Sequence, residues 1–253
     1  MDESTFDRAF DLDDPAALAS LSRLLRSWEP RLELYKPLRD AFLYEPDGTL
    51  YSIALRDGMI FKTDRRGVAV NSGDLVVVPG GHGVDAGDDV DLIAFRHDGP
   101  PPDHFRERFI QVWCFDHRPT PTYGTPNTGV IDIVAVSDVR LRIPYAVVDV
   151  NLADEAVVSA SDEVVLLLSL NGQVAVEVIG ARDKASIVLS PRHAVAVSPG
   201  SQFRLTGQGR VGLLTILNDL ANVARVASHA DSNKGPEYVP RQENRDVRAD
   251  RAD

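Results

Sequence analysis

The chain has 253 residues, of which 43% are hydrophobic and 26% are charged. This length and composition exclude a disordered or fibrous protein and provide enough chain for one large or two small globular domains. The 27 basic and 38 acidic residues leave a net charge of -11, which argues against a general binder of the nucleic-acid backbone. A single cysteine excludes an internal disulfide and a metal site made of several thiolates.

The N-terminal segment predicts a helix. Asp14 and Pro15 stand before leucines at helical spacing, and the pattern ends before Trp28-Glu29-Pro30. The residues before this helix are acidic and contain no apolar run of the kind found in a signal peptide. Elsewhere the longest apolar runs have the length of a strand rather than of a membrane span. We therefore expect a cytoplasmic protein that binds neither membrane nor nucleic acid.

From residue 31 onward, the pattern changes to short runs of β-branched and aromatic residues separated by turn residues, which predicts an almost entirely β structure. Asn171-Gly172 predicts a two-residue hairpin turn between two strands, and the glycine-rich segment from Gly80 to Asp91 predicts an acidic loop. Residues 119–129 are rich in Pro, Thr and Gly and lack apolar periodicity, so they predict a connector between two domains. Residues 218–229 predict a short helix, and the polar segment after it predicts a disordered tail.

The two halves of the chain repeat one pattern. In the first half, the turn Arg56-Asp57-Gly58 is followed by Gly73-Asp74, an apolar run and Pro79-Gly80. In the second half, Asn171-Gly172 is followed by Arg192-His193, an apolar run and Pro199-Gly200. This pattern resembles that of the cupin superfamily, and two copies in a chain of this length resemble a bicupin. The resemblance implies an all-β fold with two tandem barrels of jelly-roll (double-stranded β-helix) type, flanked by an N-terminal and a short C-terminal helix.

The expected organisation comprises an N-terminal acidic segment and helix, a first barrel, a connector, a second barrel with its terminal helix, and a disordered tail. These parts occupy residues 1–30, 31–118, 119–129, 130–229 and 230–253. The resemblance and the exposed edges of the predicted strands, which need covering, also lead us to expect a homodimer.

The resemblance implies a metal site as well, because the family holds iron, manganese, nickel or zinc with two histidines, a glutamate and a third histidine. In the second half, these positions fall on Ser159, Ser161, Val165 and Phe203, or on Arg204 in the adjacent register. In the first half, they fall on Glu45, Asp47, Tyr51 and Val84, with His82 two residues early. Neither copy keeps the ligands, and serine, valine and phenylalanine do not replace imidazole or carboxylate. We therefore expect degenerate metal motifs and no cofactor.

Two other metal sites remain as alternatives. An oxygen-rich site would use Glu45, Asp47 and His82, although Pro46-Asp47-Gly48 also has the residues of a surface turn. A histidine-rich site for a divalent ion would use His97, His104 and His117, provided that the proline-rich loop between them folds back. The competing interpretation places these histidines at the exposed ends of strands.

The remaining candidates are side chains that a small ligand would contact at the barrel mouths. They are Tyr51, Arg56, His82, Ser159, Ser161, Phe203 and Arg204. Surface positions on alternating strands explain the polar ones equally well. The expected function is metal-independent binding of an unknown small molecule, or a role in assembly. The alternative is a cupin enzyme, either a metal-dependent dioxygenase or isomerase with non-standard ligands, or a metal-free sugar epimerase in which His82 and Tyr51 serve as acid and base.

Overall fold

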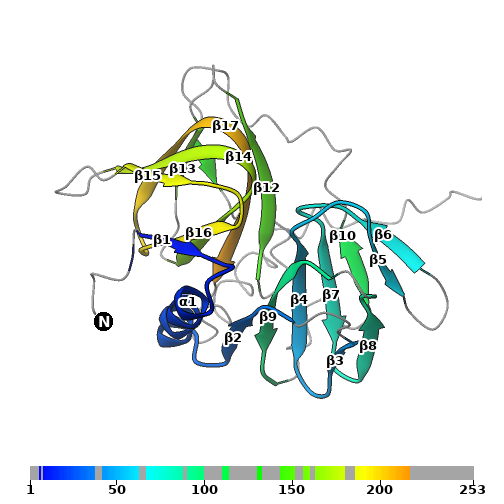
Figure 1. Cartoon of the computed structure of the whole chain (residues 1–253). Coiled ribbons are helices and arrows are strands. Elements are labelled where there is room, and N and C mark those ends of the chain that lie inside the picture. Colours follow the sequence, from blue (N-terminus) through cyan, green and yellow to red (C-terminus); the bar gives the residue numbers. More distant parts are fainter. Residues whose placement is uncertain are drawn as a thin grey trace, which may run out of the picture. The chain divides into compact units, whose positions relative to one another are not determined.

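Figure 1 shows the chain as a computed structural model, which describes residues 6, 8–37, 42–62, 67–87, 90–99, 110–113, 130–132, 143–151, 156–159, 163–179 and 186–216. All of these residues belong to one compact unit that spans residues 1–219. The predicted connector, C-terminal helix and tail lie outside the described residues. Among the described helices, none is long and apolar enough to cross a membrane.

The described part of the chain contains one helix and a series of strands, which confirms the prediction of an all-β fold. In chain order the elements are β1 (Ala9–Asp11), α1 (Pro15–Trp28), β2 (Leu32–Tyr35), β3 (Phe42–Glu45), β4 (Thr49–Ala54), β5 (Met59–Lys62), β6 (Gly67–Val70), β7 (Leu75–Pro79), β8 (His82–Asp85), β9 (Leu92–His97), β10 (Gln111–Trp113), β11 (Val130–Asp132), β12 (Tyr145–Val150), β13 (Ala156–Ser159), β14 (Val164–Ile179), β15 (Ser186–Leu189), β16 (His193–Val197) and β17 (Gln202–Ile216).

The helix α1 begins and ends where the sequence predicts. Asp14 is its N-cap, and the Asp14 carboxylate accepts a hydrogen bond of 2.9 Å from the backbone N–H of Ala16. Proline follows the cap, where its missing N–H costs nothing. The leucines at helical spacing, of which Leu21 and Leu25 are fully buried, form the face that packs on the core.

The strands form three sheets, none of which closes on itself. In the first half, one sheet has the order β10-β7-β4-β9-β2 and the other has the order β3-β8-β5-β6. In the second half, one sheet has the order β1-β16-β14-β17-β13-β11, with β12 paired to β17 and β15 paired to β14. Among the described pairs, only the pairing of β1 with β16 joins the segment before β2 to the second half.

The two halves repeat the same strand register. Leu50 on β4 is opposite Arg96 on β9, as Val165 on β14 is opposite Thr215 on β17. In both halves, the N-terminal part of this central strand also pairs with the strand that precedes the Pro-Gly turn, β7 or β16. The repeat in the sequence therefore corresponds to a repeat in strand pairing.

The turns before β7 and β16 match as well. Gly73 has a φ of +91° and Arg192 a φ of +66°, so both residues have a left-handed backbone. The N–H of Gly73 donates to the carbonyl of Ala54 at 2.8 Å, and the N–H of Arg192 donates to the carbonyl of Ser169 at 2.9 Å. Arg192 thus occupies a turn position that the first half fills with glycine.

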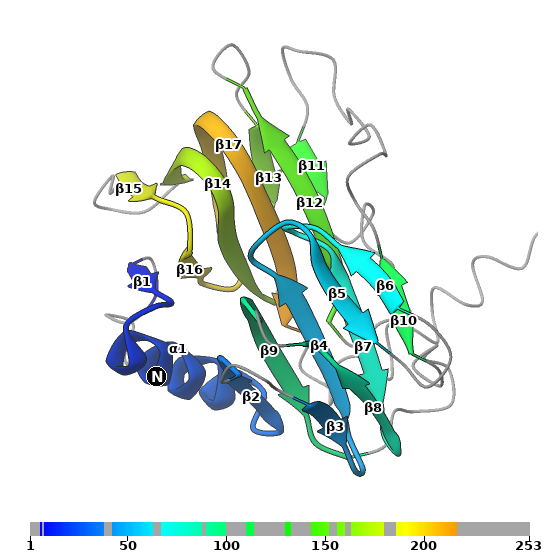
Figure 2. The same ribbon diagram turned by 45° about the vertical axis from the view of Figure 1, so that its right-hand side comes forward.

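The predicted hairpin at Asn171-Gly172 is wrong, because β14 runs through it without a break. A bulge lies between Ser169 and Asn171, and β17 continues beside β14 along its whole length (Figure 2). Gly172 has a φ of +70°, and a Cβ there would lie 2.2 Å from the carbonyl oxygen of Gln208. The glycine therefore permits a bend with close backbone contact between two long strands, which curve together within one sheet.

Two short strands are additional to the prediction. The segment predicted as an acidic loop contains β8, which pairs with β3 and β5. The N-terminal strand β1 pairs with β16, so that Phe10 is opposite Ala194. Both strands are too short, or too rich in glycine and polar residues, to show an alternating apolar pattern.

Three apolar clusters form the core. The shared core combines α1 and β1 with one face of β2, β4, β7 and β9 and one face of β12, β14, β16 and β17. The first-half interior contains Leu50, Val84 and their neighbours, and the second-half interior contains Val165, Phe203 and theirs. The Tyr145 hydroxyl crosses the shared core and donates a hydrogen bond of 2.9 Å to the carbonyl of Gly73. The two halves are therefore joined by a continuous apolar core.

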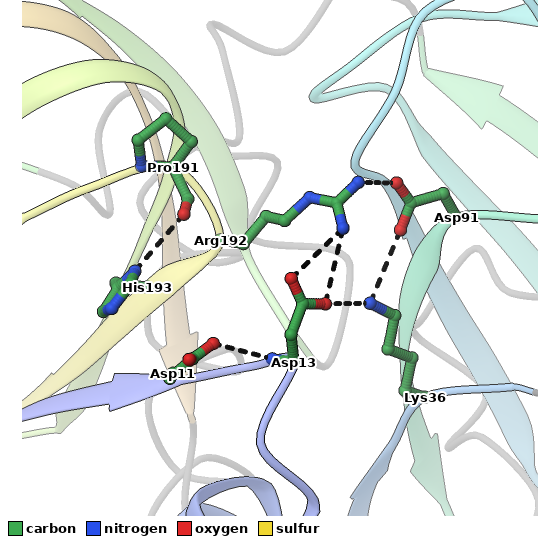
Figure 3. A network of polar contacts seen from close by, with 7 residues as sticks. All are labelled: Asp11, Asp13, Lys36, Asp91, Pro191, Arg192 and His193. Carbon is green, nitrogen blue, oxygen red and sulfur yellow. Dashed lines mark hydrogen bonds and ion pairs between the residues drawn. The ribbon is translucent and has the colours of Figure 1, made fainter.

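A network of four charged side chains also links the halves (Figure 3). Arg192, from the second half, pairs with Asp91, just before β9, and its Nη1 lies 3.2 Å from an oxygen of Asp13. Lys36, after β2, pairs with Asp13 and lies 3.5 Å from Asp91. Lys36, and to a lesser degree Arg192, lower the pKa of Asp13, against the opposing effect of its burial. The segment between β1 and α1 is thereby held to both halves.

Candidate functional site

The second-half interior is filled with apolar side chains. Its members are Val148, Val150, Val165, Leu167, Val174, Val176, Leu189, Val195, Val197, Phe203, Leu205, Val211 and Leu213. Val165 and Phe203 stand where the resemblance places a glutamate and a histidine, and both are fully buried in this cluster. Neither side chain has a lone pair for a metal, so these residues do not fit a metal ion of the family type.

The first-half interior has apolar residues at two of the corresponding positions. Val84 is buried there, 1% exposed, at the position of the last histidine. Leu50, the neighbour of Tyr51, lies in the first-half interior, as Val165 lies in the second-half interior. Tyr51 lies on the other face of β4 and is fully buried in the shared core. Among the residues of this half that the structure describes, Val84 and Tyr51 thus supply no metal ligand to the interior.

The first half differs at one end, where a half-buried ion pair lies beside the interior. Glu45, at the end of β3, is only 2% exposed, and its Oε2 lies 3.0 Å from Nε of Arg96 on β9. Arg96 alternates along β9 with Ala94 and Leu92, which belong to the first-half interior, so it projects on the same face. Glu45 and Arg96 thus form the ion pair at this end, and Glu33 on β2 is the residue opposite Arg96 in the pairing of β2 with β9.

The Glu45 carboxylate is held by the turn that follows it. Its Oε1 accepts hydrogen bonds from the backbone N–H of Gly48 at 2.9 Å and of Asp47 at 3.3 Å. A Cβ at position 48 would lie 2.3 Å from the carbonyl oxygen of His97, so only glycine fits there. The turn Pro46-Asp47-Gly48, predicted from its residues, therefore fixes the carboxylate that binds Arg96.

Three further side chains surround this ion pair. Tyr35, at the end of β2, packs against the first-half interior, and burial together with the charge of Glu45 raises its pKa. Asp98 is 59% exposed, and its Oδ1 lies 3.2 Å from Nε of Arg96. His82 is opposite Glu45 in the pairing of β3 with β8; it is exposed, and its Nδ1 lies 3.1 Å from the carbonyl of Gly80. We call Tyr35, Glu45, Arg96 and Asp98 the polar end of the first half.

The predicted oxygen-rich and histidine-rich metal sites are only partly within the described residues. Glu45 and His82 are neighbours across the strands, but Asp47 is exposed in the turn and contributes its backbone N–H to Glu45. His97 is buried, with its Nε2 4.0 Å from Glu29 Oε1 and its Nδ1 3.1 Å from the carbonyl of Asp98. His104 and His117 lie outside the described residues. Within the described ranges, no group of three or more His, Cys, Asp or Glu side chains is placed to hold a metal ion.

The other ligand candidates are dispersed. Arg204 is opposite Glu177 on β14, and its Nη1 lies 3.5 Å from Glu177 Oε2, on the face of β17 away from Phe203. Arg56 is partly buried in the turn after β4. Ser159 ends β13, and Ser161 lies outside the described residues. Among the described residues, the predicted pair Tyr51 and His82 is not brought together, since one is in the shared core and the other is exposed.

The comparisons with known proteins concern the fold. No protein-family model and no curated protein matches the sequence. HEPD from Streptomyces albus, solved with 2-hydroxyethylphosphonate and Fe(II), matches with a TM-score of 0.52 and 12% identity, over 82% of this chain and 71% of that chain. The Escherichia coli protein YlbA matches with a TM-score of 0.49 and 9% identity, over 73% of this chain and 76% of that chain. A mutant salicylate 1,2-dioxygenase from Pseudoaminobacter salicylatoxidans matches with a TM-score of 0.48 and 13% identity, over 83% of this chain and 84% of that chain.

Identities this low establish a likeness of fold and nothing finer. The likeness to HEPD agrees with the strand pairing described above, because such neighbours are cupin-fold proteins. The chain has the all-β, jelly-roll fold of the cupin type, with open sheets.

Proposed function

We propose that this protein is a bicupin that binds a small polar ligand at the polar end of its first half, without metal-dependent catalysis. The observation that carries the proposal is the contrast between the two halves. At the positions of family ligands, the second half has Val165 and Phe203 inside a packed apolar cluster. The first half instead has the Glu45–Arg96 ion pair, of which Arg96 is 37% exposed.

The exposure of Arg96 favours binding over core packing as the role of this ion pair, since Arg96 is 37% exposed whereas Glu45 is 2% exposed. Apolar residues of similar volume usually stabilise a core as well as a buried ion pair does. The Arg96 guanidinium is therefore accessible to a polar partner, while Glu45 holds it from the buried side. Small-molecule sites commonly combine apolar walls with a few fixed polar groups, which is the composition of this end of the first half.

The test is the metal content of the untagged, full-length protein, measured by inductively coupled plasma mass spectrometry for iron, manganese, nickel and zinc. We expect well below one metal ion per chain, and no change in the midpoint of thermal unfolding after dialysis against a chelator. Metal in a one-to-one ratio that is lost together with stability would overturn the proposal and favour the metal-dependent enzyme. A purely structural role in assembly is the outcome if no polar ligand shifts the unfolding midpoint.

The cytoplasmic location and the homodimer stay predictions. Light scattering at micromolar concentration tests the dimer. Phe42 and Tyr44 are exposed on β3, and their stacked rings have centroids 6.5 Å apart. If a dimer is found, these are the first side chains to substitute.

A further inference from the structure

We infer that Arg96 takes the place of the metal cation and anchors a small carboxylate ligand, which displaces Asp98 from the guanidinium. This inference rests on the proposed function, because it names the ligand class for the same site. Glu45 falls on a family ligand position, and its partner here is a guanidinium from the facing sheet. A fixed guanidinium supplies a positive charge and directed N–H donors, which suit a carboxylate.

Arg96 is held in place before any ligand binds. Two contacts to Glu45 fix it, Nε to Oε2 at 3.0 Å and Nη2 to Oε1 at 3.5 Å. Glu45 is itself fixed by the N–H groups of the following turn. The side chain of Arg96 therefore loses little further conformational freedom when it binds a ligand, which favours affinity.

The contact between Asp98 and Arg96 is a model for how a ligand carboxylate would bind. Its carboxylate contacts Arg96 at 3.2 Å and is 59% exposed, whereas the carboxylate of Glu45 is 2% exposed. An ion pair with such an exposed partner is weak, because water screens it and the side chain must be immobilised. A free carboxylate therefore competes with Asp98 for Arg96, but it does not displace the buried Glu45.

The residues next to Arg96 are smaller than those at the corresponding place in the second half. The cross-strand pair adjacent to Leu50 and Arg96 consists of Ser52 and Ala94, whereas its equivalent in the second half consists of Leu167 and Leu213. The hydroxyl of Ser52 is fully buried and has no hydrogen-bond partner among the described residues. A buried hydroxyl without a partner is costly, and a ligand that reaches it from Arg96 removes that cost.

Tyr35 adds a neutral donor to the same end. Its hydroxyl is protonated at neutral pH, as in any tyrosine, and burial and then the charge of Glu45 raise its pKa further, against the opposing charge of Arg96. A protonated phenol donates a hydrogen bond to a carboxylate, whereas a phenolate would repel it. Arg96 and Tyr35 of the polar end, together with the nearby Ser52, thus offer hydrogen-bond donors.

The experiment compares acetate with its neutral analogue acetamide, by isothermal titration calorimetry on the full-length protein at low ionic strength. We expect acetate alone to bind, and Asp98→Asn to tighten acetate binding about two- to fivefold because it removes the internal competitor. Asp47→Asn is the matched control, since it removes an exposed negative charge next to Glu45 without a described contact to Arg96. It should change the affinity by less than Asp98→Asn does.

A second variant removes the anchor. Because Arg96→Gln alone would leave Glu45 buried without its cation, the double variant Arg96→Gln with Glu45→Gln replaces the ion pair by two amides. We expect it to keep the wild-type circular dichroism spectrum and to lose acetate binding. Acetate binding that is unchanged in the double variant, equal effects of Asp98→Asn and Asp47→Asn, or no saturable binding to wild type and Asp98→Asn would each overturn the inference. None of these results depends on the metal content. The carboxylate inference can therefore fail while the proposal of a metal-independent protein holds, and the reverse is also true.

Discussion

Arg192 combines a left-handed backbone with ion pairs to Asp13 and Asp91. A non-glycine residue in this conformation is strained, so the contacts of its side chain and backbone hold it there. Its carbonyl also accepts a hydrogen bond of 3.0 Å from the N–H of Leu12, which ties the N-terminal segment to the turn. The residue thus joins the turn, the N-terminal segment and the first half.

Two substitutions separate the strain of Arg192 from its ion pairs. Arg192→Ala and Arg192→Gly both remove the guanidinium, but only glycine adopts a φ of +66° without strain. We expect the glycine variant to be the more stable of the two by about 0.5–1 kcal/mol, after the greater flexibility of unfolded glycine is taken into account. Urea unfolding curves measure the difference. Equal stability of the two variants would show that the turn imposes no strain.

Asp13 makes part of the stability dependent on pH. Its pKa is lowered in the folded chain, so it stabilises the fold above its ordinary pKa, and this contribution is lost as the pH falls through the lower folded value. We expect Asp13→Asn to be less stable than wild type at neutral pH and equal to it once the pH has fallen below the lowered pKa of Asp13. The gap should be small and should shrink with salt, because Asp13 is 44% exposed. A gap that persists at low pH would assign the effect to something other than charge.

A substitution of Tyr145 tests the hydrogen bond inside the shared core. Tyr145→Phe leaves the carbonyl of Gly73 without the hydroxyl that donates to it at 2.9 Å. We expect a loss of roughly 1–3 kcal/mol in the free energy of unfolding, the usual cost of an unsatisfied buried acceptor. Tyr44→Phe is the control, because Tyr44 is 55% exposed on β3, and it should change stability little. Similar losses in both variants would argue against a specific contribution of the contact.

At the scale of elements, the bend in β14 explains a glycine that looks like a turn in the sequence. Gly172→Ala places a Cβ 2.2 Å from the carbonyl of Gln208 at a φ of +70°. We expect a loss of at least about 2 kcal/mol, because the left-handed backbone and the overpacking both contribute. Gly200→Ala is the matched control, since its φ is +76° and nothing lies within 4 Å of the added Cβ. Chemical denaturation of both variants should show the larger loss at Gly172.

The sequence predicts elements better than their connections. The strands and α1 follow from alternation and from the Asp14 cap, and the structure confirms them. An Asn-Gly pair is found both at hairpin turns and at bends within a strand. The sequence pattern around Asn171-Gly172 therefore does not distinguish a hairpin from a continuous β14. The strand β1 has three residues, and its partner β16 lies far along the chain, so no local signal marks it.

Prediction of the site from the sequence has the same limit, as the polar end shows. Glu45 was a candidate because it falls on a family ligand position, but Arg96 was not, because one arginine near the end of an apolar strand resembles an ordinary surface position. Their contact depends on the register that pairs β9 with β4 and on the packing of the two sheets. The available signal was the alternation along β9, which places Arg96 on the face of Ala94.

At the scale of the whole molecule, the shared core makes the two halves interdependent. Each half contributes one sheet face to it, with Ile53 and Phe95 from the first and Leu166 and Leu214 from the second, and all four are at most 1% exposed. Separation would expose a large contiguous apolar surface, which soluble proteins rarely tolerate. The halves resemble two domains in their strand pairing, but they share one core.

This interdependence predicts the behaviour of a chain divided at the predicted connector. Fragments 1–118 and 130–253, expressed alone, should be insoluble or aggregated, because each leaves its face of the shared core uncovered. Co-expressed, they should form a soluble one-to-one complex that elutes with the full-length protein in size-exclusion chromatography. The double substitution Leu166→Asp with Phe95→Asp is the control, since charges at the centre of the shared core should prevent the complex. If instead fragment 130–253 is soluble and folded alone, as judged by a cooperative thermal transition, then its own interior around Phe203 suffices for folding. The shared core would in that case be an interface between independent domains.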